Sequence, residues 1–70
     1  MEEEILKKKA DWVISQKLKI EDSDKIKESS IEFFPDRYLV MAVLESGSVR
    51  KVVTKDQGLA YAILGELSKK

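Results

Sequence analysis

The 70-residue chain carries 13 basic and 13 acidic side chains, has no net charge, and contains neither cysteine nor histidine. The missing cysteines exclude disulfides and thiolate metal sites, and the missing histidines remove the commonest metal ligand and the usual general base near neutral pH. Zero net charge also argues against the positive field that is typical of nucleic-acid-binding proteins.

This length predicts one domain, residues 1–70, with a core that is small for its surface. Small domains are stabilised by disulfides, metals, tight packing or association, and a chain without cysteine and histidine depends on the last two. The sequence has no apolar run near 18 residues and no signal-peptide pattern, which predicts no membrane partner and a cytoplasmic location. Asparagine is absent while lysine and glutamate are abundant, a composition typical of proteins from thermophiles.

The first predicted element is a helix over residues 1–17. Its apolar residues recur at spacings of three and four, which places them on one side of a helix: Leu6, Ala10, Val13 and Ile14. Three glutamates precede three lysines in this segment, an order that suits the helix dipole. Beyond the helix, residues 22–24 (DSD) predict a turn, and the polar stretch from Asp22 to Ser29 predicts a surface connection.

Three strands follow. An alternating pattern that begins at Ser30 predicts the first of them. A turn over residues 34–37, with proline at its first central position, leads to the strongest strand, Tyr38–Leu44. A second turn, in which Gly47 can adopt a positive φ, leads to the third strand, Val49–Thr54. The short turns predict that the three strands form an antiparallel meander.

The last predicted element is a helix that begins just after Thr54. Thr54 and Gln57 have the three-residue spacing of a capping box. The apolar residues beyond them fall on one stripe: Leu59, Ala60, Ile63, Leu64 and Leu67. The element order is therefore α-β-β-β-α, and the sequence predicts a two-layer α+β domain in which a three-stranded antiparallel meander is flanked by N- and C-terminal helices.

The sequence offers little for catalysis. The serines have no histidine to activate them, and the three glycines are too scattered to form a phosphate-binding loop. The only dense acidic group outside the first helix, Glu21, Asp22 and Asp24, lies in the polar connection and is predicted to be solvated rather than to bind a metal. We therefore predict a protein that is not an enzyme, with no catalytic residue, no metal and no cofactor.

The strand Tyr38–Leu44 is apolar on both faces, although a half-exposed antiparallel strand should alternate apolar and polar residues. If both helices pack on one face of the sheet, the other face leaves an apolar patch, and such patches usually mark association surfaces. If one helix covers each face, the protein is a three-layer monomer. We favour the first arrangement and predict a protein-binding domain that forms a homodimer or binds another protein through five residues: Phe33, Phe34, Val40, Met41 and Val43.

A second hypothesis comes from a run without acidic residues, from Ser46 to Lys55. Cations in and near this run would neutralise phosphates, which predicts a small nucleic-acid-binding domain that uses Arg37, Arg50, Lys51 and Lys55. The same charges could instead protect an edge strand against aggregation. Arg50 and Lys51 are also neighbours in a strand and point to opposite faces, which divides the basic surface.

The α-β-β-β-α order along the whole chain resembles that of the double-stranded-RNA-binding domain. That family carries a basic lysine cluster at the start of its last helix, whereas the matching segment here, residues 54–58 (TKDQG), holds one lysine beside an aspartate. The three strands and last helix are also similar in topology to the arm-binding domains of phage-type integrases. Both resemblances imply the nucleic-acid-binding function of the second hypothesis, but topology alone does not determine function.

Overall fold

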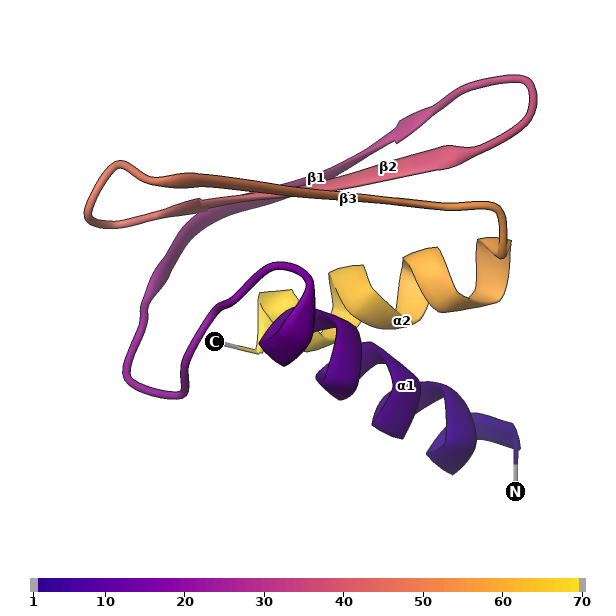
Figure 1. Ribbon diagram of the computed structural model, residues 1–70, viewed down its shortest axis with the longest axis horizontal. Coiled ribbons are helices and arrows are strands. Elements are labelled where there is room, and N and C mark those ends of the chain that lie inside the picture. Colours follow the sequence, from indigo (N-terminus) through magenta and orange to yellow (C-terminus); the bar gives the residue numbers. More distant parts are fainter. Residues whose placement is uncertain (1, 70) are drawn as a thin grey trace.

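The computed structural model describes residues 2–69 and contains the five predicted elements in the predicted order. Figure 1 shows helix α1 (Glu2–Gln16), strands β1 (Ile26–Phe33), β2 (Tyr38–Leu44) and β3 (Val49–Thr54), and helix α2 (Gln57–Ser68). The strands form one antiparallel sheet in the order β1-β2-β3, so the predicted meander and fold class are confirmed.

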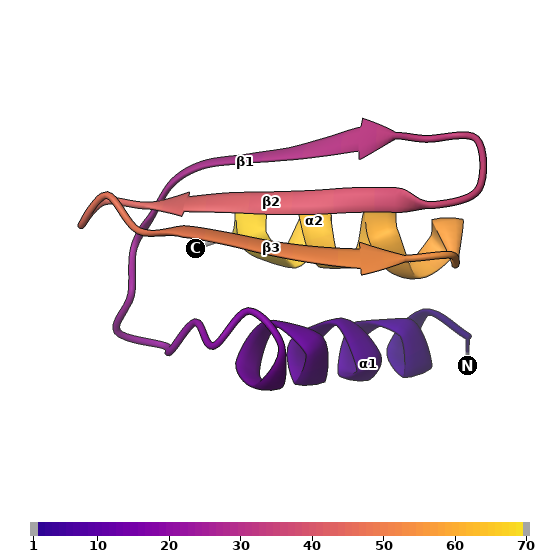
Figure 2. The same cartoon turned by 45° about the horizontal axis from the view of Figure 1, so that its top comes forward.

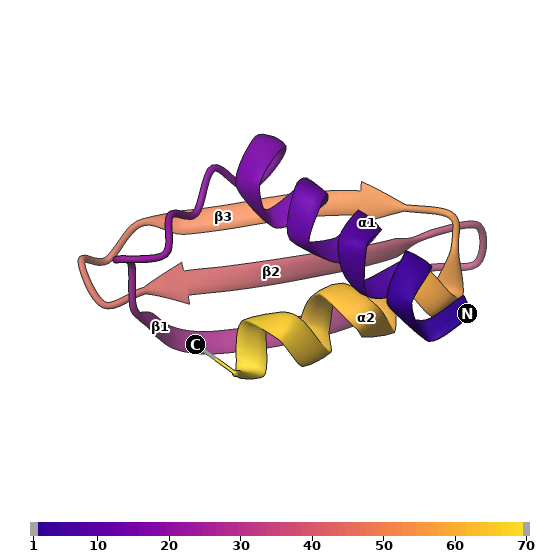
Figure 3. The same cartoon turned by 90° about the horizontal axis from the view of Figure 1, so that it is seen from below.

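Both helices lie on the same face of the sheet (Figures 1 and 2). Helix α2 packs against all three strands, and α1 packs against α2. From below, α2 runs beneath β1 and β2 while α1 crosses on the side of β3 (Figure 3). Figure 1 shows the sheet edge-on with both helices below it, which makes two layers. The opposite face of the sheet is therefore not covered by any element of residues 2–69, and we call it the open face.

The core lies between the sheet and the two helices. Strand β2 presents alternate residues to the helices, and α1, α2 and the segment after α1 supply the rest. The buried apolar residues are Ala10, Val13, Ile14, Leu18, Ile20, Val40, Ala42, Leu44, Ala60, Ile63 and Leu67. No polar or charged side chain of the described residues is buried with them, so hydrophobic packing is the main interaction between the two layers.

The segment after α1 is fixed to the sheet by Arg50. Its Nη1 atom donates hydrogen bonds to the backbone oxygens of Leu18, at 3.1 Å, and of Lys19, at 3.3 Å. Lys19 has a positive φ of 55°, which turns the chain sharply at the end of the helix. This turn places the side chains of Leu18 and Ile20 in the core, with 1% and 4% of their surface exposed.

Strand β1 begins at Ile26, four residues before the predicted start at Ser30. Ile26 pairs with Leu44 and packs against the core, and the pairing register shifts between Ile26 and Glu28. The polar residues before Ser30 predicted a connection, but at an edge strand polar side chains can point to solvent while the backbone pairs on one side. Only the first part of the predicted connection, up to residue 25, lies outside the strand.

Helix α2 is capped by Asp56, not by the predicted Thr54. The Asp56 carboxylate accepts a hydrogen bond of 3.1 Å from the backbone N–H of Leu59. The Thr54 hydroxyl instead accepts a hydrogen bond from the backbone N–H of Asp56, at 3.1 Å, and so supports the cap.

Neither helix within residues 2–69 has the length and apolar character needed to cross a membrane.

Candidate protein-interaction surface

The open face is built from alternate residues of the three strands, which the pairing register aligns in three rows. Side chains that are directly opposite each other in antiparallel strands lie on the same face. The first row is Glu28, Val43 and Val49, the second is Ser30, Met41 and Lys51, and the third is Glu32, Leu39 and Val53. Met41 is therefore at the centre of the face, on the central strand.

The apolar residues of the open face are grouped on β2 and β3. We call Leu39, Met41, Val43, Val49 and Val53 the apolar patch. The two β3 valines are among the most exposed large apolar side chains of the described residues, at 51% for Val49 and 54% for Val53, and the three β2 residues are half-buried between the neighbouring strands. A continuous apolar patch across two strands marks a surface that association would cover.

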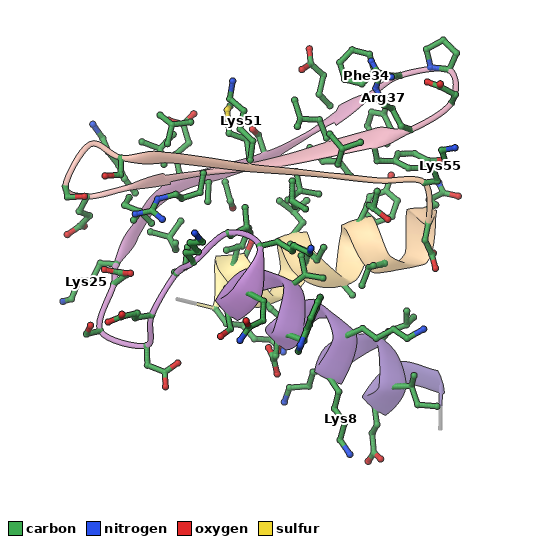
Figure 4. The ribbon with its side chains drawn as sticks, in the orientation of Figure 1. Lys8, Lys25, Phe34, Arg37, Lys51 and Lys55 are labelled. Atoms are coloured by element: carbon green, nitrogen blue, oxygen red, sulfur yellow. The ribbon has the colours of Figure 1, made fainter. Side chains whose placement is uncertain are left out.

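In the three paired rows of the open face, the charged residues are separated by sign. Strand β1 carries the acidic side, Glu28 and Glu32 on either side of Ser30, and β3 carries the basic side, Lys51 between the two valines. Figure 4 shows Lys51 on the side of the sheet opposite the helices. None of these three charges forms an ion pair within residues 2–69, where the salt bridges join Asp36 to Arg37 and Glu66 to Lys69.

Of the five predicted interface residues, the structure places Met41 and Val43 on the open face. The prediction for Val40 is corrected: its side chain points to the helices and has no exposed surface, because odd and even residues of β2 face opposite sides. Phe33 is also on the helix side of the sheet, where its ring contacts those of Tyr38 and Tyr61 at centroid distances of 5.8 and 6.2 Å. Phe34 follows β1 in the turn at one end of the sheet.

The four cations of the nucleic-acid hypothesis are distributed over three separate places. Arg50 is on the helix side and bonded to two backbone oxygens, and Lys51 is on the open face. Arg37 and Lys55 lie near Phe34 at one end of the molecule (Figure 4), where Arg37 is 5.2 Å from the centroid of the Phe34 ring and 3.9 Å from the Asp36 carboxylate. The predicted division of Arg50 and Lys51 between two faces agrees with this arrangement.

The predicted acidic group lies in a turn in which Glu21 and Asp24 are hydrogen-bonded to each other. Asp24 is used locally, since its carboxylate accepts a 2.8 Å hydrogen bond from the backbone N–H of Glu21. No group of three or more acidic side chains that could bind a metal ion is present within the described part of the chain. Glu21 and Asp22 line an open hollow beside α1 and the end of α2.

Two carboxyl groups in this hollow influence each other. Loss of water contact and a hydrogen bond with Glu66 raise the pKa of Asp11. A hydrogen bond from Lys69, whose Nζ lies 2.9 Å from a carboxylate oxygen of Glu66, lowers the pKa of Glu66. The pair joins α1 to α2, and the loss of water contact, Lys69 and the contact between the two carboxyl groups together explain the two pKa shifts without a ligand.

Three residues of the apolar patch, Leu39, Val49 and Val53, were not among the predicted interface residues. The turn at Gly47, which has the expected positive φ of 97°, could have predicted the two valines through the pairing of β2 with β3. A turn of known length fixes which residues of β2 and β3 are opposite each other, and Val43 pairs with Val49 as a result.

Comparison of the chain with protein-family models, curated proteins and solved structures finds no match.

Proposed function

We propose that this protein is a non-enzymatic protein-binding domain that associates with a second copy of itself through the open face of its sheet. The observation that carries the proposal is the apolar patch on a face that neither helix covers. Covering the apolar patch with a further layer is favourable, because apolar surface in water is unfavourable. A second copy of the same sheet supplies that layer in the aligned packing of a β-sandwich.

The charges of the open face also favour a second copy as the partner. The acidic side is on β1 and the basic side is on β3, so a twofold rotation can bring the acidic side of one copy opposite the basic side of the other. The apolar patch would lie in the middle and the charges at the rim, as in most protein interfaces. Three strands make a narrow face, below the roughly 800 Å² per partner of a standard interface, and we expect a dissociation constant in the micromolar range or above.

Replacing Met41 by glutamate tests this proposal. The charge would lose water at the centre of the interface, with only Lys51 of the same copy opposite it, and removing a charge from water is unfavourable. We expect sedimentation velocity between about 10 µM and 1 mM to show a monomer–dimer equilibrium for the wild-type protein and a monomer for Met41→Glu. Trp12→Glu is the matched control, because it adds the same charge at an exposed apolar residue of α1, 56% exposed, and should leave the dimer intact.

Two results would contradict the proposal. One is a wild-type protein that stays at the 8.0 kDa monomer mass up to the highest concentration. The other is a Met41→Glu variant that dimerises as well as the wild type. Circular dichroism on each variant verifies that the comparison is between folded proteins.

Nucleic-acid binding is the second candidate function. Phe34, Arg37 and Lys55 support this function, because they place two cations and an aromatic ring at one end of the molecule. Arg50 argues against it, because it lies on the helix side of the sheet and not on that surface. If this function were the main one, binding would weaken steeply with added salt, because each neutralised phosphate releases counterions. We expect no complex with duplex or single-stranded nucleic acid tighter than about 1 µM at physiological salt.

A further inference from the structure

The arrangement of charges on the open face determines how two copies can be oriented, if they associate as proposed above. Two identical sheets can pack face to face about a twofold axis that lies between them, either along the strands or across them. An axis along the strands places β1 of one copy over β3 of the other, with β2 over β2. An axis across the strands places β3 over β3 and β1 over β1.

The two orientations differ in which charges meet. With the axis across the strands, Lys51 would face the partner's Lys51, and Glu28 would face the partner's Glu32. Like charges in contact are unfavourable, and here both edges of the interface would carry them. With the axis along the strands, each Lys51 faces the row of the partner's Ser30, which has a glutamate on each side.

We infer that two copies pack with the twofold axis along the strands, so that Lys51 of each copy lies between Glu28 and Glu32 of the other. Met41 then meets the partner's Met41 at the centre, and a flexible thioether side chain adapts well to such a self-contact. The sheets are about 10 Å apart in aligned packings, a distance that extended lysine and glutamate side chains span together. Both edges are near solvent, so the lysine can bury its methylene groups and keep its charge at the rim.

Glu28, Glu32 and Lys51 make no ion pair within the described chain. In the dimer these three charges determine the orientation of the two copies, while the apolar patch provides the affinity. The charge pattern favours a second copy over an unrelated partner, because each charged side of the face has its complement on the same molecule.

Charge reversal separates the two orientations. With the axis along the strands, Lys51→Glu turns two symmetric attractive contacts into repulsive ones, and we expect the dissociation constant to rise by about tenfold to a hundredfold. The triple change Lys51→Glu, Glu28→Lys and Glu32→Lys restores opposite charges at both contacts and should return the constant to near the wild-type value. Lys55→Glu, the same change of charge at a residue beyond the end of β3, is the matched control and should have little effect.

The outcomes also separate this inference from the proposed function. If the wild type dimerises and Met41→Glu abolishes the dimer, but Lys51→Glu leaves the dissociation constant unchanged, the open face is the interface and the inferred orientation is wrong. With the axis across the strands, Lys51→Glu replaces one like-charge contact by another, which is why no change is expected there. A wild-type monomer at all concentrations would overturn both the function and the orientation.

Discussion

The two faces of strand β2 have nearly the same apolar composition but opposite surroundings. Val40, Ala42 and Leu44 point to the helices and are buried, and the residues between them point to the open face and are only half-buried. The helix layer therefore covers one face of the strand and leaves the other uncovered. The difference shows that the composition of a strand indicates how many layers a sheet needs, while the paths of the connections determine which layers the chain itself provides.

The largest expected difference between the faces is in stability. Leu44 is 4% exposed on the helix face, and Leu44→Ala would leave a cavity in the core and cost about 2–5 kcal/mol of unfolding free energy. Leu39 is on the same strand but on the open face, and Leu39→Ala should cost less than about 1 kcal/mol. Urea unfolding at a protein concentration well below the dissociation constant of the dimer measures both; equal losses would contradict the two-layer account.

A smaller contrast is expected between neighbouring cations of β3. Arg50→Ala removes the two hydrogen bonds to the oxygens of Leu18 and Lys19 and should cost about 1–2 kcal/mol, because bonds from a charged donor are strong. Lys51→Ala, on the open face, should change stability by less than about 0.5 kcal/mol. The same unfolding experiment compares them. Equal stability of the two variants would mean that Arg50 does not hold the segment after α1 in solution.

The smallest effect concerns the start of α2, which lies entirely in the helix layer. Asp56→Ala removes the cap that accepts from the Leu59 N–H and should cost about 1 kcal/mol. Because Asp56 is outside the open face, its loss should not change the dissociation constant of the dimer. Thr54→Ala should cost less than Asp56→Ala; the reverse order would indicate that the capping box predicted from the sequence forms after all.

Most of the fold was predictable because local signals agreed with the final structure. The bounds of β2 and β3 follow from two turns with clear proline and glycine positions, and the core stripe of α2 follows from its helical spacing. The start of β1 was predicted too late, since Lys27 and Glu28 are polar residues at an edge whose pairing with β2 depends on tertiary structure. The cap was assigned to Thr54 because the capping-box pattern does not reveal which of two nearby side chains reaches the helix.

The candidate site was only partly predictable. Alternation along β2 showed that Met41 and Val43 lie on the face opposite Val40, but not which face the helices cover. That choice depends on the direction in which the chain turns between β3 and α2, because α2 is the helix that packs against the strands. Phe33 was assigned to the wrong side for the same reason, because its contacts with Tyr38 and Tyr61 require α2 to lie on that side.

The central claim, that the open face and not the helix layer is the association surface, is tested most directly by nuclear magnetic resonance on a dilution series. The chain has one tryptophan, Trp12, on the outer side of α1, and the Met41 methyl group marks the centre of the open face. We predict that the Met41 methyl signal shifts with concentration while the Trp12 indole signal does not. A Trp12 signal that shifts while Met41 stays constant would place the association on the helix layer and contradict the account.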